Sequence, residues 1–304
     1  MSFQFKEITV TLENYKQIFK NCTPDVLDEI RSAVLDDTPI ASFIDECGTD
    51  SYKLGQIRIG LREMMPLGFL NTNLTGRTIY LIRQCLKNNI SVDDLFVYVE
   101  EDKLKLPSGT IEKLAEFVYL GADISMIDFT KVKESKIELV LQGLLYHYPM
   151  WLIIDEDYPI SYMKSLMRGM QLEIDITPFL SGKWSEQQMF LLFSYSKRID
   201  IMDFMSKINE QFDVESLKVL LKLYKENVPI TTLCVQDQDG TPIYNSYQIE
   251  ELGKAIKDKT ITHEMYNPLL SDKSMSVLHE KELEKRKPKP KKVKLSGVTD
   301  IAEK

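Results

Sequence analysis

Three stretches of the 304-residue chain share one pattern and decide the fold: LGQIRIGL (54–61), IELVLQGL (137–144) and MKSLMRGM (163–170). In each stretch an apolar residue stands at the first, fourth and eighth positions, and a glycine stands at the seventh. This spacing covers one face of an α-helix and lacks the alternation of a strand. The stretches therefore predict helices that bury the same face, with the glycine allowing a neighbouring helix to come close.

The pattern continues through nine copies between residues 24 and 265. The first apolar position is occupied by Leu27, Leu54, Ile79, Ile111, Ile137, Met163, Gln188, Leu217 and Ile249. The small-residue position is occupied by Ala33, Gly60, Cys85, Phe117, Gly143, Gly169, Ser194, Leu223 and Ala255. Across the three apolar columns 26 of 27 residues are apolar, with Gln188 as the exception. Phe117 and Leu223 predict looser packing in the fourth and eighth copies.

A second column marks helix starts after each of the first eight copies. It contains Pro39, Pro66, Ser91, Asp123, Pro149, Asp175, Asp200 and Pro229. Ser and Asp side chains accept hydrogen bonds from the free N–H groups of a first turn, and proline suits the first helical position. The column predicts a short second helix in each of these eight units, whose apolar anchors recur every 25 to 32 residues; the ninth copy lacks the mark, as a terminal repeat often does. Stacked units of this kind form an all-α fold, an α-solenoid of about nine helix-turn-short-helix repeats. A compact helical bundle is the alternative, but it does not need so regular a period.

The two ends of the chain depart from the repeat. Residues 1–23 contain the alternating stretch FQFKEITVTL, which predicts a small N-terminal cap with one strand and a helix. The helical repeat domain covers residues 24–266. Residues 267–304 form a C-terminal extension, and its Pro/Lys-rich part predicts a disordered or extended tail after about residue 280.

Two segments, SYKLGQIRIGL (51–61) and GMQLEIDITPF (169–179), resemble a short helical repeat of about 25 residues found in proteins of Firmicutes, their phages and mobile elements. Ile57, Gly60 and Leu61 match its first helix, and the run Ile174-Asp175-Ile176 with Phe179 matches its turn and second helix. The resemblance covers residues 24–265, although only two or three copies are close. It implies the repeat fold and a bacterial or phage origin, and it brings no catalytic residues.

The composition excludes several classes of protein. The chain has no apolar run near the ~20 residues of a membrane helix and no signal-peptide pattern, so we expect a cytoplasmic protein. Its four cysteines form no close pair and its three histidines stand far apart, which argues against disulfide scaffolds and metal sites. We expect no cofactor and no metal. The net charge is −8, but residues 281–294 carry a local +6, so the rest of the chain is strongly acidic.

Arg31, Arg58 and Arg83 occupy equivalent positions in the first three copies. If the copies stack, the arginines form a ladder that can bind phosphate or an acidic partner. The alternative is pairing with neighbouring acids such as Asp28 and Glu29, and the sequence favours this alternative because surface charges usually face solvent.

In four later copies the same position is occupied by apolar residues, namely Leu141, Met167, Leu192 and Leu221. These residues are either buried between helices on two sides or exposed as an apolar patch that binds a partner. Burial is the favoured explanation. We retain all four, with the three arginines, as candidate partner-binding residues.

Two further features have a simple structural alternative. The sequence DQDGT (237–241) imitates the nucleophile loop of haloacid-dehalogenase-like phosphatases, but the chain lacks the alternating strands and helices of that fold, so a turn is the better explanation. Acid clusters at 93–94, 100–102 and 155–157 fall in inter-repeat connections and are expected to share one edge, where they serve solubility or attract a basic surface. No catalytic site can be assembled from the sequence.

These features predict a non-enzymatic repeat protein that binds another protein as adaptor, scaffold or inhibitor. The resemblance suggests a phage or mobile-element factor that acts on a host defence protein. The alternative is association with nucleic acid through the basic tail, because Lys and Arg neutralise phosphates. Its candidate residues are Lys285, Arg286, Lys287, Lys289, Lys291, Lys292 and Lys294. We expect no membrane partner.

Overall fold

The computed structural model of the chain describes residues 2–6, 8–70, 73–99, 103–154 and 157–287, and the described part is mostly α-helical. It divides into two compact units, Met1–Met167 and Arg168–Lys304, which we describe separately. The only sheet in the described residues is a two-stranded antiparallel hairpin in the first unit. Predicted helical content is thus confirmed.

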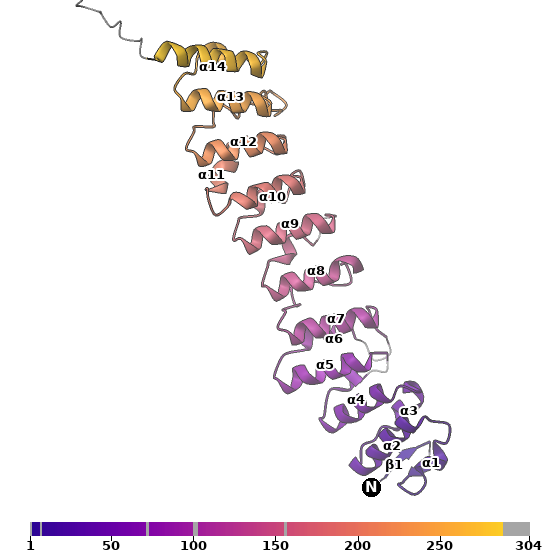
Figure 1. Cartoon of the computed structure of the whole chain (residues 1–304). Helices are drawn as coiled ribbons and strands as arrows, with labels where there is room; N and C mark the ends of the chain where they lie inside the picture. Colours follow the sequence, from indigo (N-terminus) through magenta and orange to yellow (C-terminus); the bar gives the residue numbers. More distant parts are fainter. Residues whose placement is uncertain (1, 7, 71–72, 100–102, 155–156, 288–304) are drawn as a thin grey trace, which may run out of the picture. The chain divides into compact units, whose positions relative to one another are not determined.

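The first unit begins with the hairpin of β1 (Phe3–Phe5) and β2 (Ile8–Val10), in which Gln4 pairs with Thr9. The sequence predicted one strand there, whereas the structure has two. The long helices are α2 (Pro24–Asp36), α4 (Ser51–Arg62), α5 (Gly76–Lys87), α7 (Ser108–Tyr119) and α8 (Glu134–Leu145). The short ones are α1 (Tyr15–Ile18), α3 (Ala41–Cys47), η1 (Leu67–Leu70), α6 (Asp93–Phe96) and η2 (Met150–Leu152). Each long helix packs on the next one along the chain (Figure 1).

In the second unit the long helices are α10 (Glu186–Tyr195), α12 (Val214–Lys225), α13 (Ser246–Lys257) and α14 (Asp272–Arg286). The short ones are η3 (Thr177–Phe179), α11 (Ile201–Met205) and η4 (His263–Tyr266), and helix α9 (Ile160–Gln171) contains the residue at which the units divide. Again the long helices pack in chain order, α10 on α12, α12 on α13 and α13 on α14 (Figure 1).

Most long helices begin with the same local chemistry. Seven of their N-cap side chains accept a hydrogen bond from the N–H three residues later; they are Thr23, Asp50, Thr75, Ser185, Asp213, Asn245 and Ser271. Each cap lies four residues before a buried or half-buried apolar residue, for instance Asp213 before Leu217. The cap therefore fixes which face of the helix turns inward.

The helix ends repeat as well, at a fixed distance from the small-residue column. The carbonyl of that residue accepts a bond from the N–H five positions later in eight of the nine copies, as Gly60 does from Met65 at 3.0 Å and Ala255 does from Thr260 at 2.8 Å. The residue four positions after the small residue, directly before the one whose N–H donates, has a positive φ, and this combination defines a Schellman helix end. These residues are Asp37, Met64, Asn89, Gly121, His147, Glu173, Asn227 and Lys259.

The seventh copy corrects the predicted register by one residue. Helix α10 is capped by Ser185, and it buries Met189 and Leu192 where the sequence pattern predicted Gln188 and Leu191. Gln188 is the third residue of the helix: its side chain completes a capping box and donates to the carbonyls of Glu210 and Phe212. Gln188, the one polar exception in the apolar columns, therefore appeared there only because the predicted register of this copy was one residue early.

The predicted short helices form in six of eight copies. Asp123 and Pro229 are followed only by turns. Their anchors Ile124 and Ile230 are nevertheless buried. Asp123 accepts bonds from the N–H and hydroxyl of Ser125, so its side chain closes a turn that no helix continues. In the second copy the predicted apolar anchors of the short helix are Leu67 and Leu70; Leu70 is buried as predicted, but Leu67 is 71% exposed and Phe69 is buried in its place.

The C-terminal extension is more ordered than the sequence predicted. Helix α14 runs to Arg286, packs on α13 and buries Met275 and His279. The His279 imidazole lies 3.0 Å from the Asp258 carboxylate. The helix was missed because its apolar residues do not follow the repeat columns. The predicted tail after residue 287 lies outside the described residues.

Candidate partner-binding surface

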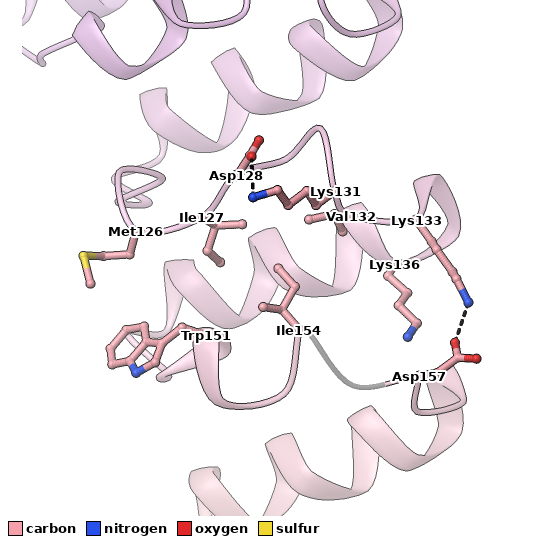
Figure 2. A pocket seen from close by; sticks show the side chains of 10 residues that line it. All are labelled: Met126, Ile127, Asp128, Lys131, Val132, Lys133, Lys136, Trp151, Ile154 and Asp157. Atoms are coloured by element: carbon pink, nitrogen blue, oxygen red, sulfur yellow. Dashed lines mark hydrogen bonds and ion pairs between the residues drawn. The ribbon is translucent and has the colours of Figure 1, made fainter.

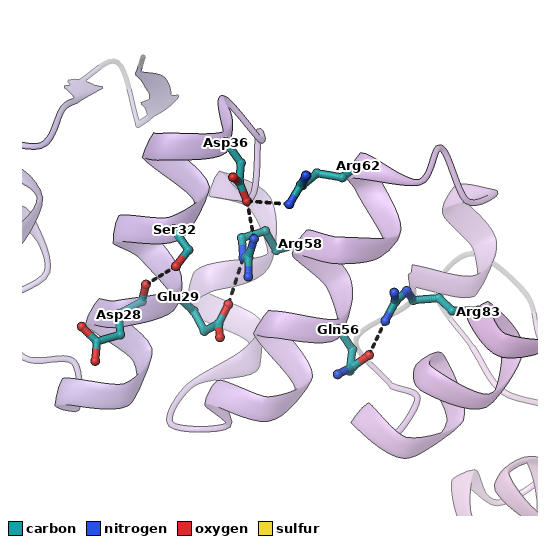
Figure 3. A network of polar contacts seen from close by, with 8 residues as sticks. All are labelled: Asp28, Glu29, Ser32, Asp36, Gln56, Arg58, Arg62 and Arg83. Atoms are coloured by element: carbon teal, nitrogen blue, oxygen red, sulfur yellow. Dashed lines mark hydrogen bonds and ion pairs between the residues drawn. The ribbon is translucent and has the colours of Figure 1, made fainter. Parts of the chain in front are cut away.

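Two of the three equivalent arginines are held in ion pairs. Arg58 donates from Nε to Glu29 at 2.9 Å and also contacts Asp36, which Arg62 approaches from the next turn at 3.2 Å (Figure 3). Arg83 is buried and makes two bonds to the Glu63 carboxylate, at 2.8 and 2.9 Å, and one to Gln56 at 2.6 Å. Arg31 is exposed on α2. Acid pairing, the favoured explanation, thus describes Arg58 and Arg83, which join neighbouring helices and do not form an open phosphate-binding ladder.

The bidentate pair of Arg83 makes stability depend on pH. The Arg83 guanidinium holds the pKa of the Glu63 carboxyl below its usual value. A carboxyl with a lowered pKa in the folded state stabilises the fold above its unfolded pKa, and this contribution is lost as the pH falls through the folded value. We expect Glu63→Gln to lower the urea midpoint at pH 7 and to change it little at pH 3. Equal losses at both pH values in urea titrations contradict this. Arg77, exposed and paired with Glu116, provides the control Glu116→Gln, with a loss within about 0.5 kcal/mol.

The apolar residues at the same position of later copies are core residues. Leu141 and Leu221 have no exposed surface, and Met167 is half-buried. Leu192 is also fully buried, but the corrected register of the seventh copy places it in the second apolar column and puts the buried Phe193 at the arginine position. The three leucines are fully buried, so as exposed partner-binding residues they were wrong, and burial, the favoured explanation, describes them.

The DQDGT loop is a closed turn. Asp237 Oδ1 accepts the N–H groups of Asp239 and Thr241 at 3.0 and 2.8 Å, and Gly240 has a φ of 81°. The side chain of Asn209 donates to the Gly240 carbonyl at 2.8 Å and ties the loop to the preceding connection. Asp237 therefore organises its own loop, as the turn explanation predicted.

The tail candidates are only partly visible. Lys285 and Arg286 end α14 and are exposed, as is Lys287, and Lys285 pairs with Glu282 at 2.5 Å. Lys289, Lys291, Lys292 and Lys294 lie outside the described residues. The acids at 100–102 and 155–156 also lie outside them.

A pocket of about 450 Å³ in the first unit was not predicted. It lies between the segment that precedes α8 and the segment around η2 (Figure 2). Its apolar wall consists of Met126, Ile127, Val132, Trp151 and Ile154. Its polar end consists of Lys131, paired with Asp128, and Lys133, paired with Asp157, together with the buried Lys136 (Figure 2).

Two large apolar side chains lie together at one end of this pocket. Met126 is 64% exposed and Trp151 is 48% exposed, and both line the pocket (Figure 2). Leu152 beside Trp151 is also exposed. We call Met126, Trp151 and Leu152 the apolar patch. Trp and Met are enriched at protein interfaces, and Trp is prominent among the residues that dominate binding energy.

The sequence contained a signal for this patch. The anchors Ile124 and Ile127, and likewise Met150 and Ile153, are three residues apart and buried. Residues between two such anchors must point away from the core, and here they include a Met, a Trp and a Leu. Apolar residues at these intervening positions therefore indicate an exposed apolar surface, which the sequence analysis did not consider.

Comparisons with known proteins give no further guide. No protein-family model, curated protein or solved structure shows a significant match to this chain. Within the described residues no three or more His, Cys, Asp or Glu side chains gather as metal ligands. None of the described helices is both long enough and apolar enough to cross a membrane.

Proposed function

We propose that this chain is a non-enzymatic α-solenoid of about nine repeats that binds another protein as adaptor, scaffold or inhibitor. The observation that carries the binding proposal is the apolar patch, in which an exposed Trp and an exposed Met lie together at a pocket. The repeated Schellman ends and chain-order packing support the solenoid. The resemblance to the Firmicutes and phage repeats favours a mobile-element factor that acts inside the cell on a host defence protein.

Site-specific cross-linking tests the binding proposal. Two variants of the protein are expressed in the cells in which it occurs naturally. One carries a photo-reactive residue in place of Leu152, and the other carries it in place of Tyr247, which is 67% exposed in the second unit. We expect position 152 to give a discrete adduct with one protein that position 247 does not give. We also expect Trp151→Asp to remove the adduct, because a charge at the patch opposes burial. Identical adducts from both positions, or an adduct unchanged by Trp151→Asp in a folded protein, contradict the proposal.

A further inference from the structure

Helices α10, α12, α13 and α14 of the second unit lie side by side and run in the same direction, so their C-terminal ends share one edge (Figure 1). At the helix starts, Gln188 of α10 donates to the Phe212 carbonyl just before α12 at 2.7 Å, and Gln248 of α13 makes the equivalent contact just before α14. At the helix ends, Lys257 of α13 donates to Glu226, which directly follows α12, at 2.8 Å. We define the basic edge as the last four residues of each of these helices with the four that follow, as far as they are described, namely residues 192–199, 222–229, 254–261 and 283–287.

The basic edge carries a strong excess of positive charge. It contains ten Lys or Arg residues and three Asp or Glu residues, a net charge of +7. Lys254, Lys257 and Lys285 are paired with carboxylates. The other seven cations are exposed and form no ion pair within the described residues; they are Lys197, Arg198, Lys222, Lys225, Lys259, Arg286 and Lys287. Their charge is therefore available to a partner.

The helix dipole alone does not account for these cations. Cations stabilise the C-terminal end of any α-helix. The equivalent positions of the five long helices in the first unit nevertheless hold two Lys or Arg residues against five Asp or Glu residues, a net charge of −3; they are residues 33–40, 59–66, 84–91, 116–123 and 142–149. Because both sets are C-terminal ends of long helices, the positive charge is a property of the second unit and not of helix ends in general.

The basic edge, all of which is described, lacks the exposed side chains that other partners need. Leu283, at 36%, is its only exposed large apolar residue, and none of its aromatic side chains is exposed. Protein interfaces are enriched in aromatic residues and depleted of Lys, and membrane-surface helices insert Trp, Phe or Leu. Single-stranded nucleic acids stack their bases on aromatic side chains. The phosphates of a duplex need only Lys and Arg, which release the counterions of the phosphates.

We propose that the basic edge binds the phosphate backbone of a nucleic acid duplex. Neighbouring packed helices lie ~8–10 Å apart, so four helix ends cover ~24–30 Å. A duplex places one phosphate every ~3.4 Å along each strand, so the edge matches ~7–9 base pairs. Contacts to phosphates carry no sequence information, and the binding is therefore independent of sequence. The apolar patch, which carries the proposed function, lies in the first unit and is a separate surface.

Binding of a fluorescent DNA duplex of about 20 base pairs to full-length protein tests the proposal, by anisotropy at about 50 and 200 mM salt. We expect Lys222→Gln with Lys225→Gln to raise the Kd about tenfold at the lower salt concentration, because two phosphate contacts are lost. The slope of log Kd against log salt falls by about 2. The matched control is Lys183→Gln with Lys273→Gln, which removes two exposed cations near the starts of α10 and α14. It changes the Kd less than about twofold, because those positions lie outside the edge.

Three results overturn the proposal. Equal losses in the two double variants mean that overall charge attracts the duplex, and the edge does not hold it. If the edge variant binds the duplex as the unchanged protein does, while changing Lys289, Lys291, Lys292 and Lys294 to Gln abolishes binding, the contacts lie in the tail. If phosphatidylserine vesicles bind in a way that depends on Lys222 and Lys225, and the duplex does not bind, the edge meets a membrane surface. None of these results changes the cross-linking adduct at Leu152, so the proposed function is tested separately.

Discussion

Replacing Leu141 with Asp is expected to unfold the helices around α8. The Leu141 side chain is completely buried. The change removes an aliphatic side chain and places a carboxylate in an apolar environment, each of which costs several kcal/mol. We expect a loss above about 4 kcal/mol, measured by the urea midpoint of circular dichroism, or failure to accumulate as soluble protein. Leu221→Asp in α12 is expected to behave in the same way.

The adjacent residue provides the matched control. Gln142 is exposed on the same turn of α8, so Gln142→Asp introduces the same carboxylate into water. It is expected to cost less than about 1 kcal/mol, through helix propensity and its place near the helix C-terminus. If Leu141→Asp and Gln142→Asp have the same midpoint, Leu141 lies on the surface and the partner-binding role of that column is open again.

The second large effect is expected at Gly76, the first residue of α5. A Cβ there would lie 2.7 Å from Cδ1 of Tyr52 and 3.0 Å from the Cα of Lys53. Tyr52 is half exposed and can move, but Lys53 Cα belongs to the backbone of α4 and can move only with that helix. We expect Gly76→Ala to cost about 1–3 kcal/mol and Gly76→Val more, since overpacking forces the two helices apart.

Gly109, in the first turn of α7, is the control for Gly76. Nothing lies within 4 Å of a Cβ built there. Gly109→Ala is therefore expected to stabilise the protein by up to about 1 kcal/mol, because alanine loses less backbone entropy in a helix. Opposite signs of the two glycine-to-alanine changes in urea titrations support the close approach of α4 and α5. A stabilising Gly76→Ala contradicts it.

Local chemistry made most of the helices predictable from the sequence. An N-cap residue four positions before the first buried apolar residue, as Thr75 before Ile79, defines where a helix begins and which face is buried. This local pattern does not depend on the element that packs against the helix. The prediction slipped at α10 because Gln188 and Leu191 imitate the columns one residue early, and the cap at Ser185 decides the register. It missed α14 because only Met275 and His279 of that helix are buried, too few for a pattern.

The sequence by itself determined that this chain forms repeated helices with a common buried face, since that depends on residue spacing, capping and the positive-φ helix ends. Only the tertiary structure decided what the equivalent position on each helix does. Glu63, at the end of α4, pairs with Arg83, whereas Leu221 at the equivalent position of α12 is a fully buried aliphatic residue. The spacing of residues along one helix does not show what its neighbour supplies. The same reason hid the patch: Met126 and Trp151 are 25 residues apart in the chain, and only the tertiary structure shows that both line one pocket.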